Sequence, residues 1–200
     1  MKIDLGCSRY KRSGYIGIDL VKEPGVDIIA DARFLPFKDS SLDGIYSNHS
    51  IEHISDQLAV IRELWRVCSD GAVIHIIVPH FSNPSYYDDL THQHKYSSRS
   101  FEHYDQELHA LTGYTDYLPE VNLKTIYRRL NYWTERTIIR KSSLKAFIIR
   151  LITDVINYFA NLNHFLCERV WCHWVGGFYE VEFKLLVKRP NLLECNNRHT

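Results

Sequence analysis

The stretch that decides the fold is residues 3–19, which read IDLGCSRYKRSGYIGID. Its two apolar ends are typical of short buried strands; the first runs into a turn at Gly6, and the second ends in an acid, Asp19. Ligands of an open parallel sheet bind at the carboxyl ends of its strands. We therefore expect Gly6 and Asp19 to lie together at a binding edge.

Three further apolar runs, 26–30, 42–47 and 72–78, continue the pattern. Runs of this kind, without alternation, favour parallel strands that are covered on both faces. A helix is predicted between the last two runs, with Asp56 capping its start and Gly71 following its end. Its apolar stripe recurs at three- and four-residue spacing: Leu58, Ile61, Leu64, Trp65 and Cys68. The connections after the first three strands are short, which leaves little room for helices there.

The second half of the chain mixes loop, helix and strand patterns. A loop is expected over 80–97, a helix over 99–111, a strand over 121–133, an amphipathic helix over 144–162 and an antiparallel strand near a sheet edge over 178–188. Together these elements predict an α/β fold, a Rossmann-like three-layer sandwich with a mostly parallel seven-stranded sheet and an antiparallel last strand. The predicted organisation is one domain, 1–190, with a cofactor-binding half 1–80, a lid or acceptor region 80–175 containing the long helix 143–163, and a loose tail 191–200.

Charge and cysteine content narrow the function classes. Lys+Arg and Asp+Glu are balanced at 24 each, so no overall positive field favours nucleic acid, and no nucleic-acid partner is expected. A local basic stripe at 124–141 is equally typical of a solvated face. The five cysteines are odd in number and scattered, with no signal peptide before them, which predicts free thiols in the cytoplasm. Cys167 and Cys172 with two nearby histidines fit no established zinc spacing, and no metal is expected.

At this point the sequence resembles a known family, the class I S-adenosylmethionine-dependent methyltransferases of the small type 11-like kind. Residues 3–19 are similar to the first two motifs of that family, and four later stretches follow in order. They are DARFLPF at 31–37, SLDGIYSNHSIEHI at 41–54, ELWRV at 63–67 before Gly71, and DDLTH at 88–92 with Phe101. The last stretch resembles small bacterial and archaeal members that are often found with polysaccharide genes.

The resemblance implies that S-adenosylmethionine is the cofactor and assigns residues to it. In the family's pattern Asp4 lies beneath the glycine loop, Asp19 holds the ribose, Asp31 accepts from the adenine amino group, and Asn48 and His49 line the methionine end. The full set of implied cofactor-binding residues is Asp4, Gly6, Cys7, Ser8, Asp19, Leu20, Asp31, Ala32, Asn48 and His49. The family's loop carries glycine where this chain has Ser8 and Tyr10.

The predicted reaction is methyl transfer to a small-molecule or glycan acceptor, on oxygen or nitrogen. His80, His92 and Asp88 are the candidate catalytic residues, because they follow the fifth strand on the binding edge and histidine exchanges protons near neutral pH. Polar loop residues bonded to backbone are the alternative interpretation. Glu52 and His53 are interpreted as structural.

Two alternatives to an active methyltransferase stay open. One is a non-catalytic or regulatory module that keeps the cofactor site, and the other is a nicotinamide-dependent oxidoreductase, disfavoured by the missing glycines. The helix at 143–163 is interpreted as a core or lid helix. A homodimer face or a membrane-surface helix is the alternative, and the latter suits a lipid-linked glycan acceptor.

Overall fold

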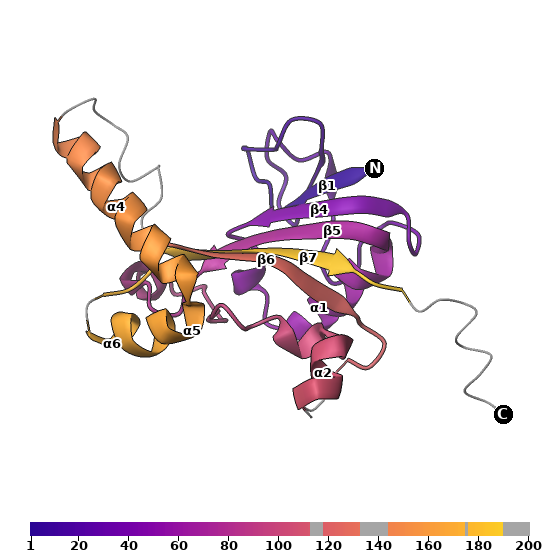
Figure 1. Cartoon of the computed structure of the whole chain (residues 1–200). Helices are drawn as coiled ribbons and strands as arrows, with labels where there is room; N and C mark the ends of the chain where they lie inside the picture. The colour runs from indigo at the N-terminus through magenta and orange to yellow at the C-terminus, as the bar shows by residue number, and fades with distance from the viewer. Residues whose placement is uncertain (113–117, 133–143, 175, 190–200) are drawn as a thin grey trace.

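A computed structural model describes residues 1–112, 118–132, 144–174 and 176–189 (Figure 1). The predicted tail 191–200 lies outside these residues. All seven strands form one sheet in the order β3-β2-β1-β4-β5-β7-β6. The strands are β1 (Lys2–Leu5), β2 (Ile16–Asp19), β3 (Ile28–Ile29), β4 (Leu42–Asn48), β5 (Cys68–Pro79), β6 (Leu123–Asn131) and β7 (Glu180–Val187). The predicted α/β, Rossmann-like fold with an antiparallel last strand is confirmed.

The helices are mostly short. They are η1 (Ile51–His53), α1 (Gln57–Val67), η2 (Pro84–Asp88), η3 (Glu102–Tyr104), α2 (Gln106–Thr112), α4 (Leu144–Leu162), α5 (His164–Leu166), η4 (Cys167–Trp171) and α6 (Cys172–Trp174). The Asp56 cap of α1 is confirmed, because its Oδ1 accepts a hydrogen bond from the Ala59 amide at 3.0 Å. Gly71 does not follow the end of this helix directly: α1 ends at Val67, and Gly71 lies inside β5.

The position of β7 corrects one expectation. It was predicted as an edge strand, but it pairs antiparallel with β5 on one side and with β6 on the other. Alternate residues of β7 are fully buried, as the pattern of 178–188 indicates, and both backbone edges are paired. The edge of the sheet is formed instead by β6.

Only one face of the sheet is fully buried. Burial alternates along β5 and β7, and the buried face packs with α1 around residues such as Ile74. On the other face Arg12 lies 4.4 Å from the Tyr46 ring, Tyr46 meets His75 edge to face, and His75 Nε2 lies 2.7 Å from Glu182 Oε1. No helix joins β1 to β2 or β2 to β3 in the structure as described, so the predicted cover on both faces is wrong for this part of the sheet.

The helix predicted over 99–111 begins later. Asp105 Oδ1 accepts hydrogen bonds from the amides of Glu107 and Leu108, which starts α2 at Gln106. The predicted cap Ser98 is used elsewhere, since its amide and hydroxyl both donate to the Glu168 carboxylate. Gly113, the predicted stop, lies outside the described residues.

Helix α4 has the predicted bounds but turns its apolar face outward. It extends away from one end of the sheet (Figure 1). Most of the predicted apolar stripe is exposed: Leu144, Phe147, Ile148, Leu151, Ile152, Val155, Phe159 and Leu162. The interpretation of this segment as a core helix is therefore wrong.

The face of α4 that meets the body is instead largely polar. Asn157 Oδ1 accepts from the Tyr132 amide, and Asn161 both accepts from the Leu130 amide and donates to the Leu130 carbonyl. Thr153 is buried on the same face. An edge strand leaves backbone groups unpaired, and these asparagines pair those at the end of β6. The helix is thus held by its polar side, which leaves the apolar side free.

Candidate active site

A pocket of about 480 Å³ opens where β1, β2 and β4 end. Its volume is within the range of small-molecule sites. The lining combines the turn after β1, the end of β2, the segment after β3 and the turn after β4. Seven predicted cofactor residues are among those that line it: Gly6, Ser8, Asp19, Leu20, Asp31, Ala32 and His49.

The turn after β1 brings backbone against the pocket. Gly6 has φ of 70°, and a Cβ on it would lie 2.0 Å from Ser50 Oγ, so no larger residue fits there. Ser8 also adopts a left-handed conformation, with φ of 46°, and its amide donates to Asp19 Oδ2 at 3.0 Å. Ser8 thus takes up a conformation that favours glycine, while one edge of Asp19 holds the loop in place.

We expect Ser8→Gly to leave the protein equally stable or to stabilise it by up to about 1 kcal/mol. A side chain in the left-handed region costs roughly 1–2 kcal/mol, which the added chain entropy of glycine partly offsets. Urea unfolding measures the change. Ser40, with φ of 55°, serves as the matched control away from the pocket. A loss of more than about 1 kcal/mol in Ser8→Gly would show that the Ser8 side chain itself supports the loop.

Asp19 ends β2 with its carboxylate at the pocket wall. Oδ2 accepts from the Ser8 amide and Oδ1 from the Val21 amide at 3.1 Å. A carboxylate has about four acceptor positions, so two remain for a ligand. Such a carboxylate can accept hydrogen bonds from two neighbouring hydroxyl groups.

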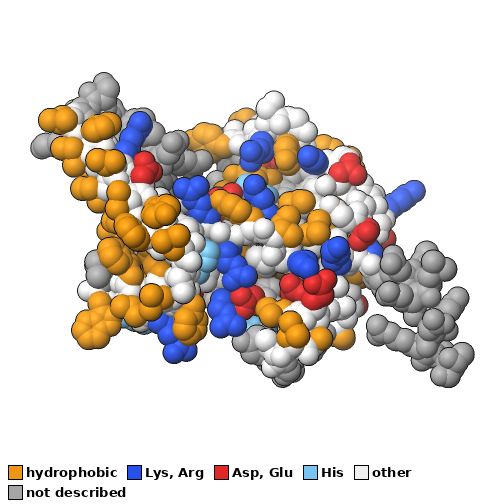
Figure 2. Space-filling model, viewed as in Figure 1, with side chains coloured by type: hydrophobic (Ala, Val, Ile, Leu, Met, Phe, Trp, Pro, Cys, Tyr) orange, Lys and Arg blue, Asp and Glu red, His pale blue; other side chains and the backbone are white. Residues whose placement is uncertain are grey.

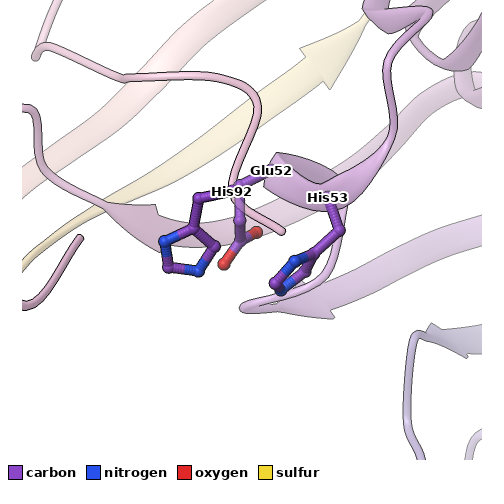
Figure 3. Close-up of side chains that lie close together, drawn as sticks. All are labelled: Glu52, His53 and His92. Carbon is purple, nitrogen blue, oxygen red and sulfur yellow. The ribbon is translucent and has the colours of Figure 1, made fainter. Parts of the chain in front are cut away.

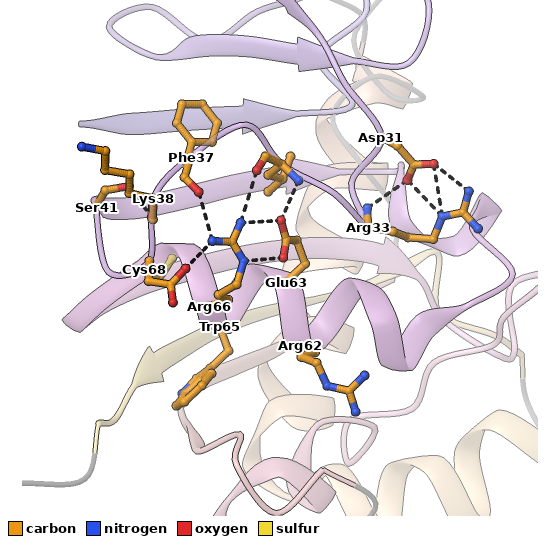
Figure 4. A network of polar contacts seen from close by, with 12 residues as sticks. Asp31, Arg33, Phe37, Lys38, Ser41, Arg62, Glu63, Trp65, Arg66 and Cys68 are labelled. Atoms are coloured by element: carbon orange, nitrogen blue, oxygen red, sulfur yellow. Dashed lines mark hydrogen bonds and ion pairs between the residues drawn. The ribbon is translucent and has the colours of Figure 1, made fainter.

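The segment after β3 carries a second acid into the pocket wall. Asp31 forms a two-pronged ion pair with Arg33, whose NH2 lies 2.6 Å from Asp31 Oδ2, and this hydrogen bond lowers the pKa of Asp31. Further along, the Leu35 amide donates to Glu63 Oε1 at 2.6 Å, and Arg66 binds the Glu63 carboxylate at both oxygens (Figure 4). Helix α1 therefore anchors this segment.

Three predicted cofactor residues do not line the pocket. Asp4 is buried, which raises its pKa, and it accepts from the Arg12 amide at 2.6 Å. The buried Cys7 thiol contacts the Gly25 carbonyl at 3.5 Å. Asn48 ends β4 outside the lining set. Asp4 and Cys7 support the loop from beneath.

His49 lies between two carboxylates. Its Nε2 is 3.0 Å from Glu180 Oε2, and its Nδ1 is 3.4 Å from Glu52 Oε1. Burial alone lowers the pKa of His49, but its contacts with Glu180 and Glu52 outweigh burial and raise the pKa to about 9. His49 has φ of 50°, which turns the chain sharply after β4.

The three candidate catalytic residues lie in different environments. His80 is fully buried, with Nδ1 2.7 Å from Ser82 Oγ and Nε2 2.9 Å from Glu168 Oε1. Asp88 lies exposed at the end of η2. Neither lines the pocket. His92 contacts His53, a lining residue, with ring centroids 4.8 Å apart.

One group was not predicted as a functional cluster. Glu52, His53 and His92 place a ligand atom each within 4.8 Å of one another (Figure 3). It is the one such group of three found among the residues with described positions, so Cys167 and Cys172 form no comparable cluster there. Glu52 and His53 were interpreted as structural because they begin a helical turn. The signal available in the sequence was the Glu-His pair directly after a strand on the binding edge.

The chain is similar to known proteins in its sequence and its fold. Residues 10–76 match a family model described as "Methyltransferase domain". Over 49 residues the chain is 42% identical to ajmaline N-methyltransferase from Rauvolfia serpentina, a match that covers 24% of this chain and spans only 17% of that relative's length.

Solved structures resemble nearly the whole fold. A SAM dependent methyltransferase from Archaeoglobus fulgidus has a TM-score of 0.54 at 17% identity, covering 92% of this chain and 85% of its own. Phosphoethanolamine N-methyltransferase 2 from Haemonchus contortus, solved in complex with S-adenosyl-L-methionine, has a TM-score of 0.50 at 16% identity, covering 94% and 48%. With its fold, its strand order and the match of residues 10–76, the chain belongs to the class I S-adenosylmethionine-dependent methyltransferases.

Proposed function

We propose that this chain binds S-adenosylmethionine in the pocket at the ends of β1, β2 and β4 and transfers its methyl group to an acceptor. The observation that carries the proposal is the pocket itself, where an acid at the end of β2, a second acid after β3 and the Gly6 turn line one cavity. The cofactor of this family supplies a methyl group that its positively charged sulfur has already activated.

The residues present fit this cofactor. The free acceptor positions of Asp19 suit the two ribose hydroxyls, and Asp31 with the Ala32 amide suits the amino group and ring of adenine. The closely packed Gly6 turn lets backbone lie against the ligand. Because the reacting group is already activated, the work left to the chain is alignment of the acceptor and removal of its proton.

The division of labour along the chain follows from this placement. Residues 1–80 supply most of the pocket, and the region 80–175 is proposed to bind the acceptor. His80, Asp88 and His92 remain the predicted candidates for proton removal. His80→Ala tests the first of them: loss of turnover with unchanged cofactor binding supports a base, whereas loss of folding supports a structural role for this buried ring.

We further propose that the acceptor is presented at a membrane surface, as a lipid-linked glycan would be. The exposed apolar face of α4 continues into that of α5, η4 and α6 through Phe165, Leu166, Val170 and Trp174. Figure 2 shows this apolar surface gathered over the projecting helix. Arg150 and Arg169 border it, as cations border the apolar face of interfacial helices. In the described part of the chain no helix has the length and apolarity to cross a membrane.

Vesicle flotation tests the membrane proposal. We expect the protein to float with vesicles that contain anionic lipid, and the double variant Leu151→Asp, Phe159→Asp to stay behind, because both side chains are exposed on the apolar face. Asp154→Asn, on the charged flank of the same helix, is the matched control and should float. Failure of the wild type to float, together with a concentration-dependent dimer that the double variant loses, would assign the face to a homodimer.

Methyl transfer is tested with S-adenosylmethionine labelled in its methyl group. The protein is given two acceptor pools, a total lipid extract and the water-soluble metabolites of the source organism. We expect label to enter the lipid pool, with release of the demethylated cofactor, and no label transfer by Asp19→Ala. Cofactor binding without label in either pool would instead support the non-catalytic module.

A further inference from the structure

Three side chains from two separate segments converge beside the cofactor pocket. Glu52 and His53 lie on η1, directly after β4, and His92 lies on the loop that follows β5. Figure 3 shows the Glu52 carboxylate pointing between the two imidazole rings. One carboxylate oxygen and one nitrogen from each ring lie within 4.8 Å of one another. Two imidazoles and one carboxylate are a ligand set that first-row divalent metals prefer.

Glu52 lacks the partners that a buried carboxylate needs. Its side chain is 0% exposed, and neither carboxylate oxygen has a hydrogen-bond partner. The nearest cationic atom is His49 Nδ1, 3.4 Å from Oε1. A buried charge is strongly unfavourable unless it is paired and hydrogen-bonded or coordinates a metal. The unsatisfied oxygens therefore point to a cationic ligand in the cluster.

The hydrogen bonds of the two histidines leave their Nε2 atoms available. The Thr91 hydroxyl donates to Asp89 at 2.6 Å, so it must accept from His53 Nδ1–H, 2.8 Å away. The Tyr86 carbonyl can only accept, so His92 Nδ1, at 3.0 Å, must also carry its proton. Both rings thus present an Nε2 lone pair. Outer hydrogen bonds of this kind orient most metal-binding histidines.

The two segments are already fixed to each other. The Gln93 amide donates to the Glu52 carbonyl at 2.9 Å, the Gln93 side chain donates to the His53 carbonyl at 3.1 Å, and His94 Nε2 lies 3.0 Å from the Ser55 carbonyl. These bonds hold His92 opposite η1 before any ligand binds. The cluster is therefore preorganised, which lowers the cost of binding an ion.

We propose that Glu52, His53 and His92 form a binding site for a first-row divalent metal ion of the Zn²⁺ class, through one Glu52 oxygen and the Nε2 atoms of both histidines. Ligand atoms around a tetrahedral ion with bonds of about 2.1 Å lie about 3.4 Å apart, so side-chain rotations of about 1 Å complete the site. In this site His92 coordinates the ion and does not accept a proton. The ion ties the loop after β5 to η1 and leaves a fourth position open. The site does not depend on methyl transfer.

Calorimetric titration of untagged, full-length protein, stripped with EDTA, tests the proposal. We expect one Zn²⁺ per chain, a higher melting temperature on binding, and slower proteolysis of the loop 80–97. Co²⁺ should give the visible absorption of a four-coordinate ion, whereas Mg²⁺, which prefers oxygen ligands, should bind far more weakly.

Variants separate this site from adventitious binding to other histidines. Glu52→Gln, His53→Gln and His92→Gln should each weaken Zn²⁺ binding by more than the roughly 10- to 100-fold expected for Thr91→Val, which removes only an outer hydrogen bond. His94→Gln, on the same loop but outside the cluster, should leave the affinity unchanged. Thr91→Val keeps the test valid if Glu52→Gln does not fold without metal. Zn²⁺ affinity that is equal in wild type, His53→Gln and His92→Gln, or equal binding of Mg²⁺, overturns the proposal.

Discussion

Asp19→Ala is expected to weaken the binding of S-adenosylmethionine by roughly 100-fold. Hydrogen bonds to a charged group contribute about 1.5 kcal/mol each, and two ribose hydroxyls on one carboxylate give about 3 kcal/mol. The loop loosens as well, because the Ser8 and Val21 amides lose their acceptor. Calorimetric titration of the variant with the cofactor measures the loss.

Glu23→Ala is the matched control for this variant. Glu23 also follows β2, but its carboxylate pairs with Arg9 at 3.5 Å and does not line the pocket. We expect its cofactor affinity to equal that of the wild type. Equal affinity in Asp19→Ala and Glu23→Ala would remove the ribose role from Asp19.

Arg66→Ala is expected to destabilise the fold by about 3 kcal/mol, the lower end of the range for removing one partner of a buried ion pair. Glu63 is only 11% exposed, and the variant leaves its carboxylate with the Leu35 amide alone. The carbonyls of Leu35 and Phe37 also lose their donor (Figure 4). Thermal unfolding should show a melting temperature lowered by roughly 6–12 °C for a domain of this size.

Arg62→Ala, on the same helix, supplies the comparison. Arg62 makes its ion pair with Glu120 at the surface, where both side chains are more than 40% exposed. Such a pair contributes at most about 1 kcal/mol. If both variants lowered the melting temperature equally, the network around Glu63 would not anchor the segment that carries Asp31. Arg66→Ala should also bind the cofactor more weakly, and Arg62→Ala should not.

The local features of the fold could be predicted, and the long-range ones could not. Asp19 and Asp31 were located because each ends an apolar run, and the bounds of α4 because its stripe is regular. The same stripe does not say which side of the helix meets the body. That side was decided by Asn157 and Asn161, which satisfy the edge strand β6. The burial of Asn157 could not be read from helical periodicity.

The site shows the same division. Residues of the pocket follow strand ends, so their convergence was predictable from the rule that ligands bind at that edge. Glu52 and His92 meet only because the loop after β5 folds back onto η1 through Gln93. No periodicity encodes that contact. His80 was favoured by its place in the chain, whereas the structure gives it two partners in a fully buried position.

The central claim, that the pocket holds S-adenosylmethionine, is tested most directly by the thermal stability of the full-length protein with added ligand. At a concentration about 100-fold above the dissociation constant, the cofactor and its demethylated product should each stabilise the fold by about 2.7 kcal/mol. Nicotinamide dinucleotides should have no effect. No stabilisation by either sulfur ligand, or equal stabilisation by the nicotinamide dinucleotides, would contradict the account.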